Sequence, residues 1–570
     1  MTSTESATST TAARAGAEEA ARQRLLNTYL RESGTPLGTT GDDLVRIDLP
    51  AAGAALVVAL RHHSVFGHHA YGDQVWLEKR DGRRVPLDHD ALVRLLLDEV
   101  EAVAAKVFGS APDGAERKRA LAEQIESSIA ATTRYLRSRR TRAADDAHAL
   151  TREAEQSLLL GHPFHPTPKS TQGFGDDLEK YAPELGAAFV PHWFAVDRRI
   201  LLERRVAAGT WIPGPVAAAA AEVLGADHGH ALLPVHPWQA RYLLANSRVA
   251  QLVTDGLLVD LGALGREVYP TSSVRTVCDP AFPTSFKLPL HVRITNFIRN
   301  NPVPHLGRAT DASAVVAELA PEWAHPGFSA LVETGFRTVD PAVVGDDLAA
   351  DFSVLYRDNP FTDGSAAPRV IAALLEDRDG DVPDLIHEVR RCAPDPDVTP
   401  GADHVAAWLR RYLGISLIPL LEIFDRDGVS FEAHAQNSLL HTDGGWPTRF
   451  WVRDMEGTSV SRQRLRPGAV PPDSPLLYDH DEAWMRLRYY AVTNHLGHLI
   501  SVLGQYTDAD EALLWRTARE MLAASGGEAA ADLLQRPVLP AKANLVSYFV
   551  GRGENPLYVD VPNLLFEVNR

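Results

Sequence analysis

Helical and strand-like periodicities occupy different parts of this chain, and their order limits the possible fold. Apolar residues recur at helical spacing near the N-terminus, for example at Leu121, Ile125 and Ile129, and again through most of the last third. Between these stretches, apolar runs of strand length are separated by prolines and glycines. Helices and strands that are segregated in this way, with no internal repeat, predict an α+β fold.

The chain has 570 residues, which is more than one hydrophobic core organises, so we expect about two to four domains. The first dozen residues are rich in serine, threonine and alanine and are expected to be disordered. A loop-rich stretch at 376–400 indicates a boundary. The predicted division is a disordered tail at 1–18, an N-terminal domain at 19–160, a strand-rich domain at 161–398 and a largely helical domain at 399–570.

Several individual elements can be predicted from the same patterns. Strands are expected at 44–49, 55–60 and 75–79, a helix at 146–160, and single long helices at 404–424 and 481–503. The sequence HTDGGWPT predicts a hairpin turn that joins strands at 429–440 and 449–456.

Composition excludes several classes of protein. The net charge of −17 argues against a nucleic-acid partner and means that any anionic ligand needs a local cationic pocket. Two cysteines, Cys278 and Cys392, are too few for a disulfide framework or a thiolate zinc site, which fits a cytoplasmic location. The N-terminus lacks the apolar segment of a secretory signal, and no run reaches the ~18 apolar residues of a membrane span, so no membrane partner is expected.

The first polar motif is GHPFHPTPKSTQGF at 161–174. Its prolines forbid a regular helix, so it is predicted to be an ordered loop that presents His162, His165 and Lys169. Such a loop could grip a carboxylate, or its histidines could serve only to hydrogen-bond the loop. A zinc half-site is disfavoured because no further ligand is near in the sequence.

The second motif joins TSSVRT at 271–276 to KLPLHVRITNFIRNN at 287–301. If the latter is a strand, its aliphatic side chains face the core, and Lys287, Arg293 and Thr295 share the other face. Asn296 is then expected to cap a short turn that places Arg299 one helical turn later. A cationic strand face in an acidic protein suggests a bound polyanion, although local carboxylate partners are the alternative. The cations expected to converge are Arg275, Lys287, Arg293 and Arg299.

Two further motifs carry acidic and amide groups. In FEAHAQN at 431–437, strand alternation would place Glu432, His434 and Gln436 on one face, with Asn437 at the exit. In FWVRDMEG at 450–457 it would place Asp454 and Glu456 together, as a pair of oxygen ligands suited to Mg²⁺. The alternatives are a polar face satisfied by its neighbours and a turn cap. The sequence contains no GxxxxGK[ST] loop, no GxGxxG after a strand and no GxSxG, so a nucleotide would be held by side chains.

These motifs, in this order, resemble the IucA/IucC family of aerobactin-synthetase-like enzymes. The resemblance also includes LLPVHPWQ at 232–239, NHL at 494–496 and KANL at 542–545, and it covers roughly residue 161 to the C-terminus. The last third resembles the FhuF-like segment that ends these enzymes. One departure is Ala435, where a glycine is common.

The resemblance implies a hand-like architecture of thumb, β-rich fingers and helical palm, usually as a homodimer. It implies a siderophore synthetase that works without a nonribosomal peptide synthetase. Such an enzyme uses ATP and Mg²⁺ to convert a polycarboxylic acid, here citrate by preference, into its adenylate with release of pyrophosphate. An amine or a hydroxyl group then attacks the adenylate.

The family's site residues carry over to matching positions of this chain. Arg299, His434 and Lys287 are the expected catalytic groups. The expected ATP contacts are Ser273, Arg275, Thr276, Lys287, Arg299, His434, Gln436 and Asn437. The expected contacts to the acid are His165, Lys169, Arg293, Thr295, Asn296 and Arg299. The expected Mg²⁺ ligands are Glu432, Asn437, Asp454 and Glu456.

Two other functions remain open at this point. One is a ligase that proceeds through an acyl-phosphate and releases orthophosphate. The other is a non-catalytic protein that binds a ferric siderophore, which only the FhuF-like end suggests. That label does not imply iron reduction, because the sequence has no cysteine cluster for an iron–sulfur centre.

Overall fold

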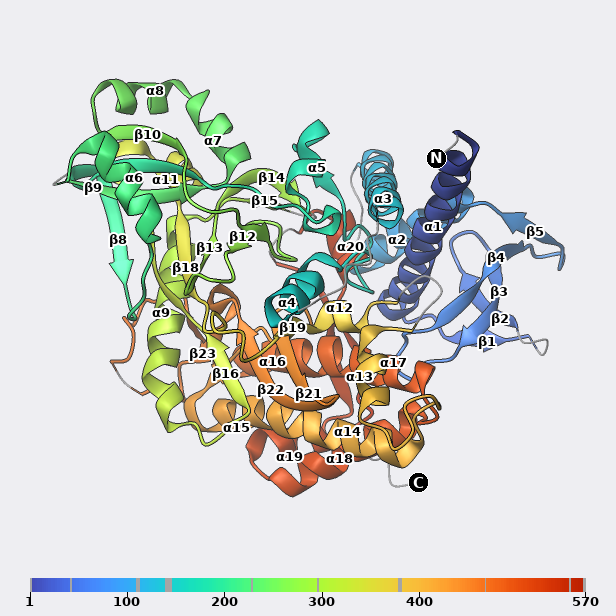
Figure 1. The fold of residues 1–570 in the computed structure, drawn as a ribbon. Coiled ribbons are helices and arrows are strands. Elements are labelled where there is room, and N and C mark those ends of the chain that lie inside the picture. The colour runs from blue at the N-terminus through green and yellow to red at the C-terminus, as the bar shows by residue number, and fades with distance from the viewer. Residues whose placement is uncertain are drawn as a thin grey trace.

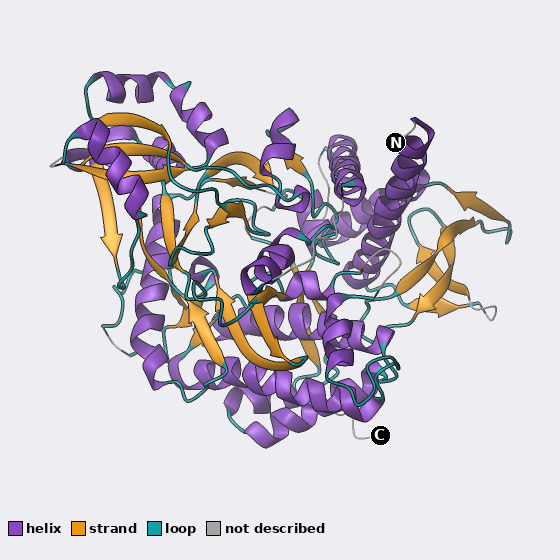
Figure 2. Cartoon of the chain, in the orientation of Figure 1, coloured by secondary structure: helices purple, strands orange, loops and turns teal. Residues whose placement is uncertain are grey.

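The computed structural model describes residues 3–40, 44–108, 113–138, 146–226, 229–294, 297–377, 382–466, 468–552 and 555–566. Helices and strands are both abundant, which confirms the α+β prediction (Figures 1 and 2). The largest cluster of buried apolar side chains lies in the C-terminal part, and separate clusters organise the middle and the N-terminal parts.

The N-terminal unit packs an antiparallel meander against helices, and the strands predicted near 44–49, 55–60 and 75–79 are all present. Its strands are β1 (Leu37–Thr39), β2 (Leu44–Leu49), β3 (Ala54–His62), β4 (Ala70–Glu78) and β5 (Arg84–Leu87). Its helices are α1 (Ser3–Ser33), α2 (His89–Phe108) and α3 (Gly114–Arg137).

Helix α1 corrects the predicted disordered tail, because the helix begins at Ser3 and includes residues 3–18 of that segment. Ala17, Ala21 and Leu25 recur at helical spacing and are buried, and α1 packs along α3. Alanine-rich sequence has high helix propensity, and the apolar stripe on α1 gives that propensity a tertiary partner.

The middle of the chain holds a six-stranded sheet with the order β11-β12-β13-β18-β17-β8. These strands are β8 (Leu201–Arg205), β11 (Tyr269–Pro270), β12 (Thr276–Cys278), β13 (Thr284–Lys287), β17 (Glu333–Val339) and β18 (Val354–Asp358). Beside it lies the sheet β10 (Leu258–Ala263), β7 (His192–Asp197) and β9 (His230–Val235).

The segment predicted as one strand at 287–301 is divided in the structure. Lys287 ends β13, Pro289 interrupts the ladder, and the chain continues as a hairpin of β14 (Leu290–Ile294) and β15 (Phe297–Arg299), with β6 (Thr171–Gln172) paired to β14. A proline donates no backbone hydrogen bond, which explains the break. Arg299 therefore lies on a strand opposite Leu290 and not on a helical turn.

The C-terminal part surrounds a four-stranded sheet with helices (Figure 1). The sheet order is β16 (Phe328–Leu331), β22 (Trp446–Arg453), β21 (Ser438–Asp443) and β19 (Arg369–Val370). The helices around it are α9 (Val303–Leu319), α14 (Ala402–Ile415), α15 (Leu417–Asp427), α16 (His480–Leu487), α17 (Gly497–Tyr506), α18 (Glu511–Ser525) and α19 (Glu528–Gln535). The predicted glycine turn joins β21 to β22 through Gly444 and Gly445, both at positive φ.

Three other predictions here are corrected. The FEAHAQN segment is not a strand, because β20 (Val429–Ser430) ends before it and β21 begins after it at Ser438. The helix predicted at 404–424 is broken at Ser416. The helix predicted at 146–160 is α4 (Ala147–Gln156), which ends before the GHPFHP loop.

A short helix near the C-terminus packs against the N-terminal helices. Helix α20 (Asn544–Phe549) packs against α1 and α2, as the red and blue ribbons in Figure 1 show. The Glu32 carboxylate on α1 accepts hydrogen bonds from the backbone N–H groups of Leu545 (2.8 Å) and Val546 (2.7 Å) at the start of α20. An acidic side chain there satisfies otherwise unpaired helix donors, so α1 is fixed against the C-terminal part.

Candidate active site

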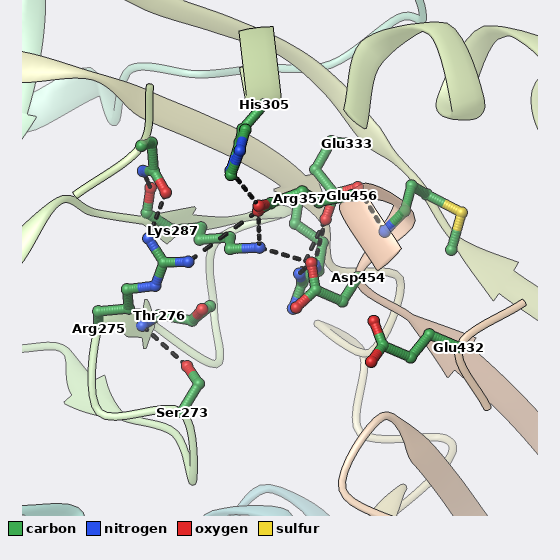
Figure 3. A network of polar contacts seen from close by, with 12 residues as sticks. Ser273, Arg275, Thr276, Lys287, His305, Glu333, Arg357, Glu432, Asp454 and Glu456 are labelled. Carbon is green, nitrogen blue, oxygen red and sulfur yellow. Dashed lines mark hydrogen bonds and ion pairs between the residues drawn. The ribbon is translucent and has the colours of Figure 1, made fainter. Parts of the chain in front are cut away.

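Lys287 lies between the two carboxylates that the sequence predicted as a metal pair. Its Nζ is 2.5 Å from Asp454 Oδ1 and 2.8 Å from Glu456 Oε2 (Figure 3). Lys287 ends β13, whereas both carboxylates follow β22, so distant segments meet at this point. Lys287 and the acidic pair therefore lie together, as the sequence predicted.

Unusual backbone geometry places two of the groups. Val274, within TSSVRT, has φ 69°, and Asp454 has φ 72°. Positive φ is costly for a β-branched residue such as Val274, and strain of this kind concentrates at functional sites. The turn at Val274 lets Ser273 Oγ accept a hydrogen bond from Thr276 N at 3.1 Å and directs Arg275 toward the acidic pair (Figure 3). Asp454 and Glu456 are thus not on a strand, because Asp454 is left-handed and Met455–Gly457 forms a 3₁₀ turn.

Three arginines surround this cluster. Arg357 on β18 lies 3.6 Å from Asp454 Oδ1 and 2.8 Å from the buried carboxylate of Glu333. Arg275 Nη2 lies 4.0 Å from Glu456 Oε2. Arg299 donates from Nη2 to the Ile294 carbonyl at 3.0 Å.

The charges keep both carboxylates ionised. Burial alone would raise the pKa of Asp454, but Lys287 and Arg357 outweigh burial and hold that pKa below its usual range. The pKa of Glu456 is held well below its usual range against the same effect of burial, by Lys287, His305 and Arg275. Burial, reinforced by Arg275, lowers the pKa of Arg299 to about 10, which leaves the guanidinium charged at neutral pH.

The FEAHAQN loop supplies a defined imidazole. His434 Nδ1 accepts a hydrogen bond from the Gln436 backbone N–H at 3.2 Å. Burial lowers the pKa of His434, and Glu432 offsets only part of that effect, so the ring is neutral at neutral pH. Because Nδ1 is the acceptor, the proton of the neutral ring is assigned to Nε2, which can donate to an anionic oxygen. This geometry favours an anion ligand over a base.

The Glu432 carboxylate packs against Gly457, at a position where no larger residue would fit. A Cβ added at Gly457 would lie 1.8 Å from Glu432 Oε2. Glu432 thereby lies close to Asp454 (Figure 3). In the described part of the chain, the Glu432 carboxylate makes no hydrogen bond, and the His434 imidazole lies beside it, with Nε2 3.9 Å from Oε1. Lys542 is also near, since Glu432 opposes the burial that lowers the pKa of Lys542, and Lys542 Nζ donates to Tyr490 Oη at 2.9 Å.

A buried ion pair supports the loops from beneath. Glu155 on α4 pairs with Arg453 at the end of β22, and both side chains are buried. Glu155 Oε2 also accepts from Ser272 N and Oγ, each at 3.0 Å. Gln436 Nε2 donates to Ser272 O at 2.9 Å, and Arg453 Nη2 donates to Gln436 O at 2.9 Å. The TSSVRT and FEAHAQN loops are therefore tied to one another and to α4, and Gln436 acts here through the loop backbone.

The donor set fits a hard cation. Asp454 Oδ2 and both oxygens of Glu432 make no hydrogen bond within the described residues, and the side chain of Asn437 makes none either. In those same residues, no three His, Cys, Asp or Glu side chains converge as a metal-binding group. Magnesium uses few protein carboxylates and completes its shell with water and phosphate oxygens, so a pair of carboxylates suffices.

The predicted contacts to the acid have different surroundings. Lys169 Nζ pairs with Glu184 Oε1 at 2.6 Å and donates to Leu158 O at 2.5 Å, which makes it a buried anchor of its loop. His165 Nδ1 accepts from Thr167 N at 3.1 Å. Arg293 is exposed on β14. Thr295 and Asn296 lie outside the described residues.

Three members of the site escaped the sequence analysis. His305 Nδ1 lies 2.9 Å from Glu456 Oε1, and Glu333 accepts from Met455 N at 3.1 Å as well as pairing with Arg357. They come from α9, β17 and β18, and none stands in a polar motif. A pocket that is partly open to solvent adjoins the site and shares Thr276 and Arg357 with it.

Comparison with known proteins identifies the family. Residues 150–376 match the IucA / IucC family, and residues 406–557 match the family described as ferric iron reductase FhuF-like transporter. L-2,3-diaminopropanoate–citrate ligase of Staphylococcus aureus (strain NCTC 8325 / PS 47) is 36% identical over 95% of each chain. This chain belongs to the IucA/IucC family.

Other members and solved structures agree with that assignment. Spermidine-citrate ligase of Bacillus anthracis is 28% identical over 96% of this chain and 98% of its own. The ATP-bound aerobactin synthetase IucA of Klebsiella pneumoniae has the same fold, with a TM-score of 0.83 and 24% identity over 96% of this chain and 99% of that chain. These relatives are ligases and synthetases, and the IucA/IucC chain described here is an enzyme of that type. No helix in its described ranges has the length and apolarity to cross a bilayer.

Proposed function

We propose that this IucA/IucC enzyme uses ATP and Mg²⁺ to adenylate citrate and then joins the citryl group to an amine, with release of AMP and pyrophosphate. The observation that carries the proposal is the cluster in which Lys287, Arg275 and Arg357 face the Asp454/Glu456 pair. The named relatives support citrate as the acid, since citrate ligases occur at 36% and 28% identity.

The chemistry follows from charge. A carboxylate that attacks the α-phosphate meets strong repulsion between anions, and preorganised cations in a partly buried site offset it. Bound Mg²⁺ would neutralise phosphate oxygens, and Glu432, Asp454 and Asn437 are its proposed ligands. Glu456 is the weaker candidate, because Lys287 and His305 already engage both of its oxygens.

The chain's own residues divide the remaining work. Lys287 and Arg299 would stabilise charge on the phosphates, and His434 would donate from Nε2 to an α-phosphate oxygen. Ser273, Arg275 and Thr276 lie on the strained turn and would hold the outer phosphates. Holding acid and nucleotide together supplies the rest of the rate enhancement. His165, Arg293, Thr295 and Asn296 remain the proposed acid contacts, whereas the buried pairing of Lys169 with Glu184 favours a structural role.

The test is a panel of carboxylic acids and amines scored by pyrophosphate release and by product mass. We expect citrate with an amine to give pyrophosphate and a citryl amide. Acid-dependent release of orthophosphate would favour an acyl-phosphate ligase instead. Iron in the purified protein without ATP turnover would favour a siderophore-binding protein. We also propose the thumb, fingers and palm division near residues 160 and 398 and a homodimeric assembly, for which the family resemblance is the support.

A further inference from the structure

Helix α1 carries one buried arginine, Arg24, and one partly buried arginine, Arg31. Arg24 and Arg31 are seven residues apart, which places them on one helix face. In the described chain neither forms an ion pair, and the Arg24 guanidinium has only one long hydrogen bond, to Leu160 O at 3.3 Å. Burying a guanidinium without a counter-charge is costly, so an anion supplied from outside the protein would be stabilising.

Arg31 is the better placed of the two to receive a ligand. Its guanidinium carbon lies 3.2 Å from the ring centroid of Phe164 in the GHPFHP loop, and Nη2 donates to Phe66 O at 3.1 Å. Stacking on one face leaves the edge of the guanidinium, with its remaining N–H donors, available to a planar anion. Burial lowers the pKa of Arg31 to about 9, and Tyr489 and Glu32 oppose that effect only in part, so Arg31 still carries its charge at neutral pH.

Neutral imidazoles lie beside this cation. His68 stacks on His498 with 5.1 Å between ring centroids and meets Phe164 edge-on at 4.7 Å. His68 Nε2 is buried and has no hydrogen-bond partner. Burial lowers the pKa of His498 to about 4 and that of His68 and His162 well below the usual range, so these rings are uncharged at neutral pH. Uncharged rings can accept hydrogen bonds from an amine.

This group of residues adjoins the proposed adenylation site. His162 lies within the electrostatic reach of both Arg31 and His434, and Asn494 Nδ2 is 2.5 Å from its Nε2. Tyr489 is close enough to both Arg31 and Glu432 for their charges to affect its pKa. The ring of Tyr490, next in sequence, lies 5.8 Å from that of His434. A ligand held by Arg31 is therefore near the end of the site where His434 lies.

We propose that Arg31 binds the carboxylate of the amine co-substrate, so that the enzyme selects an amine that carries a carboxylate, such as an amino acid, over a simple polyamine. The inference rests on the proposed ligase function. A carboxylate could also belong to the acid, but a cation beside neutral amine acceptors matches a molecule that carries both groups. The relatives named above use either kind of amine, so family membership does not decide the choice.

The test compares matched amines that differ only by a carboxylate: serine with ethanolamine, lysine with 1,5-diaminopentane, and 2,3-diaminopropanoate with 1,2-diaminoethane. Citryl-amide formation is measured for the wild type, Arg31→Met and Arg31→Lys. The wild type should prefer the carboxylate-bearing member of at least one pair. Arg31→Met should raise the KM for the carboxylate-bearing amine about 10- to 100-fold, the usual range for a charge-assisted hydrogen bond. It should thereby reduce the preference for that amine over its partner without a carboxylate. Arg31→Lys should recover part of it, because the charge remains and the fork is lost.

Citrate-dependent exchange of labelled pyrophosphate into ATP, measured without amine, separates the possible failures. Arg14→Met, an exposed arginine on the same helix paired with Glu126, is the matched control and should match the wild type in both assays. No exchange in the wild type would overturn the proposed function itself. Exchange without any preference for carboxylate-bearing amines would overturn the inference alone. If Arg31→Met raised the KM for citrate in the exchange assay, Arg31 would bind the acid and not the amine, and the inference would be overturned. If Arg31→Met lost both exchange and the folded structure, Arg31 would be a structural residue, which would also overturn the inference.

Discussion

The ammonium of Lys287 lies 2.5 Å from Asp454 Oδ1 and thereby occupies one side of the proposed cation site. Lys287 also contacts Glu456 Oε2 at 2.8 Å, so a single cation bridges the pair. Asp454 Oδ2 has no hydrogen-bond partner in the described residues, which leaves one face of that carboxylate open to a metal. Lys287 and Mg²⁺ are therefore expected to share Asp454 and to place two positive charges against the same phosphates.

Replacement of Lys287 by methionine should lower the rate of citrate-dependent pyrophosphate exchange by about 10²- to 10³-fold, as loss of a preorganised electrostatic group does. The control is Lys118→Met, which removes a lysine that pairs with Asp98 at the surface. Exchange rates at saturating ATP and Mg²⁺ provide the measurement. A Lys287→Met enzyme within threefold of the wild type would show that this lysine does not stabilise the transition state.

Replacement of Asp454 by asparagine should raise the Mg²⁺ concentration for half-maximal exchange by about 10-fold or more, because a metal ligand loses its charge. Glu456→Gln should shift the Mg²⁺ requirement less, since Lys287 and His305 hold both of the Glu456 oxygens. Mg²⁺ titrations of the two variants give the comparison. A larger shift for Glu456→Gln would exchange the roles assigned to the two carboxylates.

The buried pair of Glu155 and Arg453 should affect stability more than local chemistry. Glu155→Gln leaves the Arg453 guanidinium buried without its counter-charge, and the expected loss is about 3 kcal/mol in the free energy of unfolding. The double variant Glu155→Leu/Arg453→Met should lose less than the sum of Glu155→Leu and Arg453→Met made singly, because it removes both charges together. Urea unfolding of the wild type, these two single variants and the double variant measures the coupling, and strict additivity would contradict it.

Stability should fall as the pH decreases from about 6.5 toward 4, because buried histidines are neutral in the folded protein. Burial lowers the pKa of His495 to about 4 and that of His236 to about 3. His495 Nδ1 lies 2.8 Å from Ala433 O, and His236 Nδ1 accepts from Trp238 N at 3.1 Å. In this pH window the unfolded chain binds protons that the folded protein does not, so each histidine contributes a slope of about 1.4 kcal/mol per pH unit.

Urea unfolding at pH 7.0, 6.0 and 5.0 tests this dependence. His236→Asn keeps a hydrogen-bond acceptor at the start of α7 (Pro237–Leu244). It should reduce the slope of the free energy of unfolding against pH by the contribution of one histidine. A free energy of unfolding that is constant from pH 7.0 to 5.0 would contradict the assigned burial.

The sequence predicted most of the charged groups of the site but not their geometry. Lys287, Asp454 and Glu456 were recognised from residue type and family motif, and the structure brings them together. Strand alternation was the wrong geometry for Glu432 and His434, because both lie on a bent loop. Contacts with Ser272 and Arg453 fix the shape of this loop, and such contacts leave no periodic pattern in the local sequence. His305, Glu333 and Arg357 were missed because long-range packing of α9, β17 and β18 brings them in. Residues 3–18 were mispredicted because packing against α3 is not visible in local composition.

The account depends on attack by a carboxylate oxygen of the acid on the α-phosphate at the Lys287 site. Citrate labelled with ¹⁸O in its carboxylates, incubated with ATP, Mg²⁺ and an amine, tests this directly, with mass spectrometry of the nucleotide and phosphate products. We predict one ¹⁸O atom in AMP for each citryl amide formed and none in orthophosphate. Label in orthophosphate, with ADP as the nucleotide product, would contradict the adenylation mechanism.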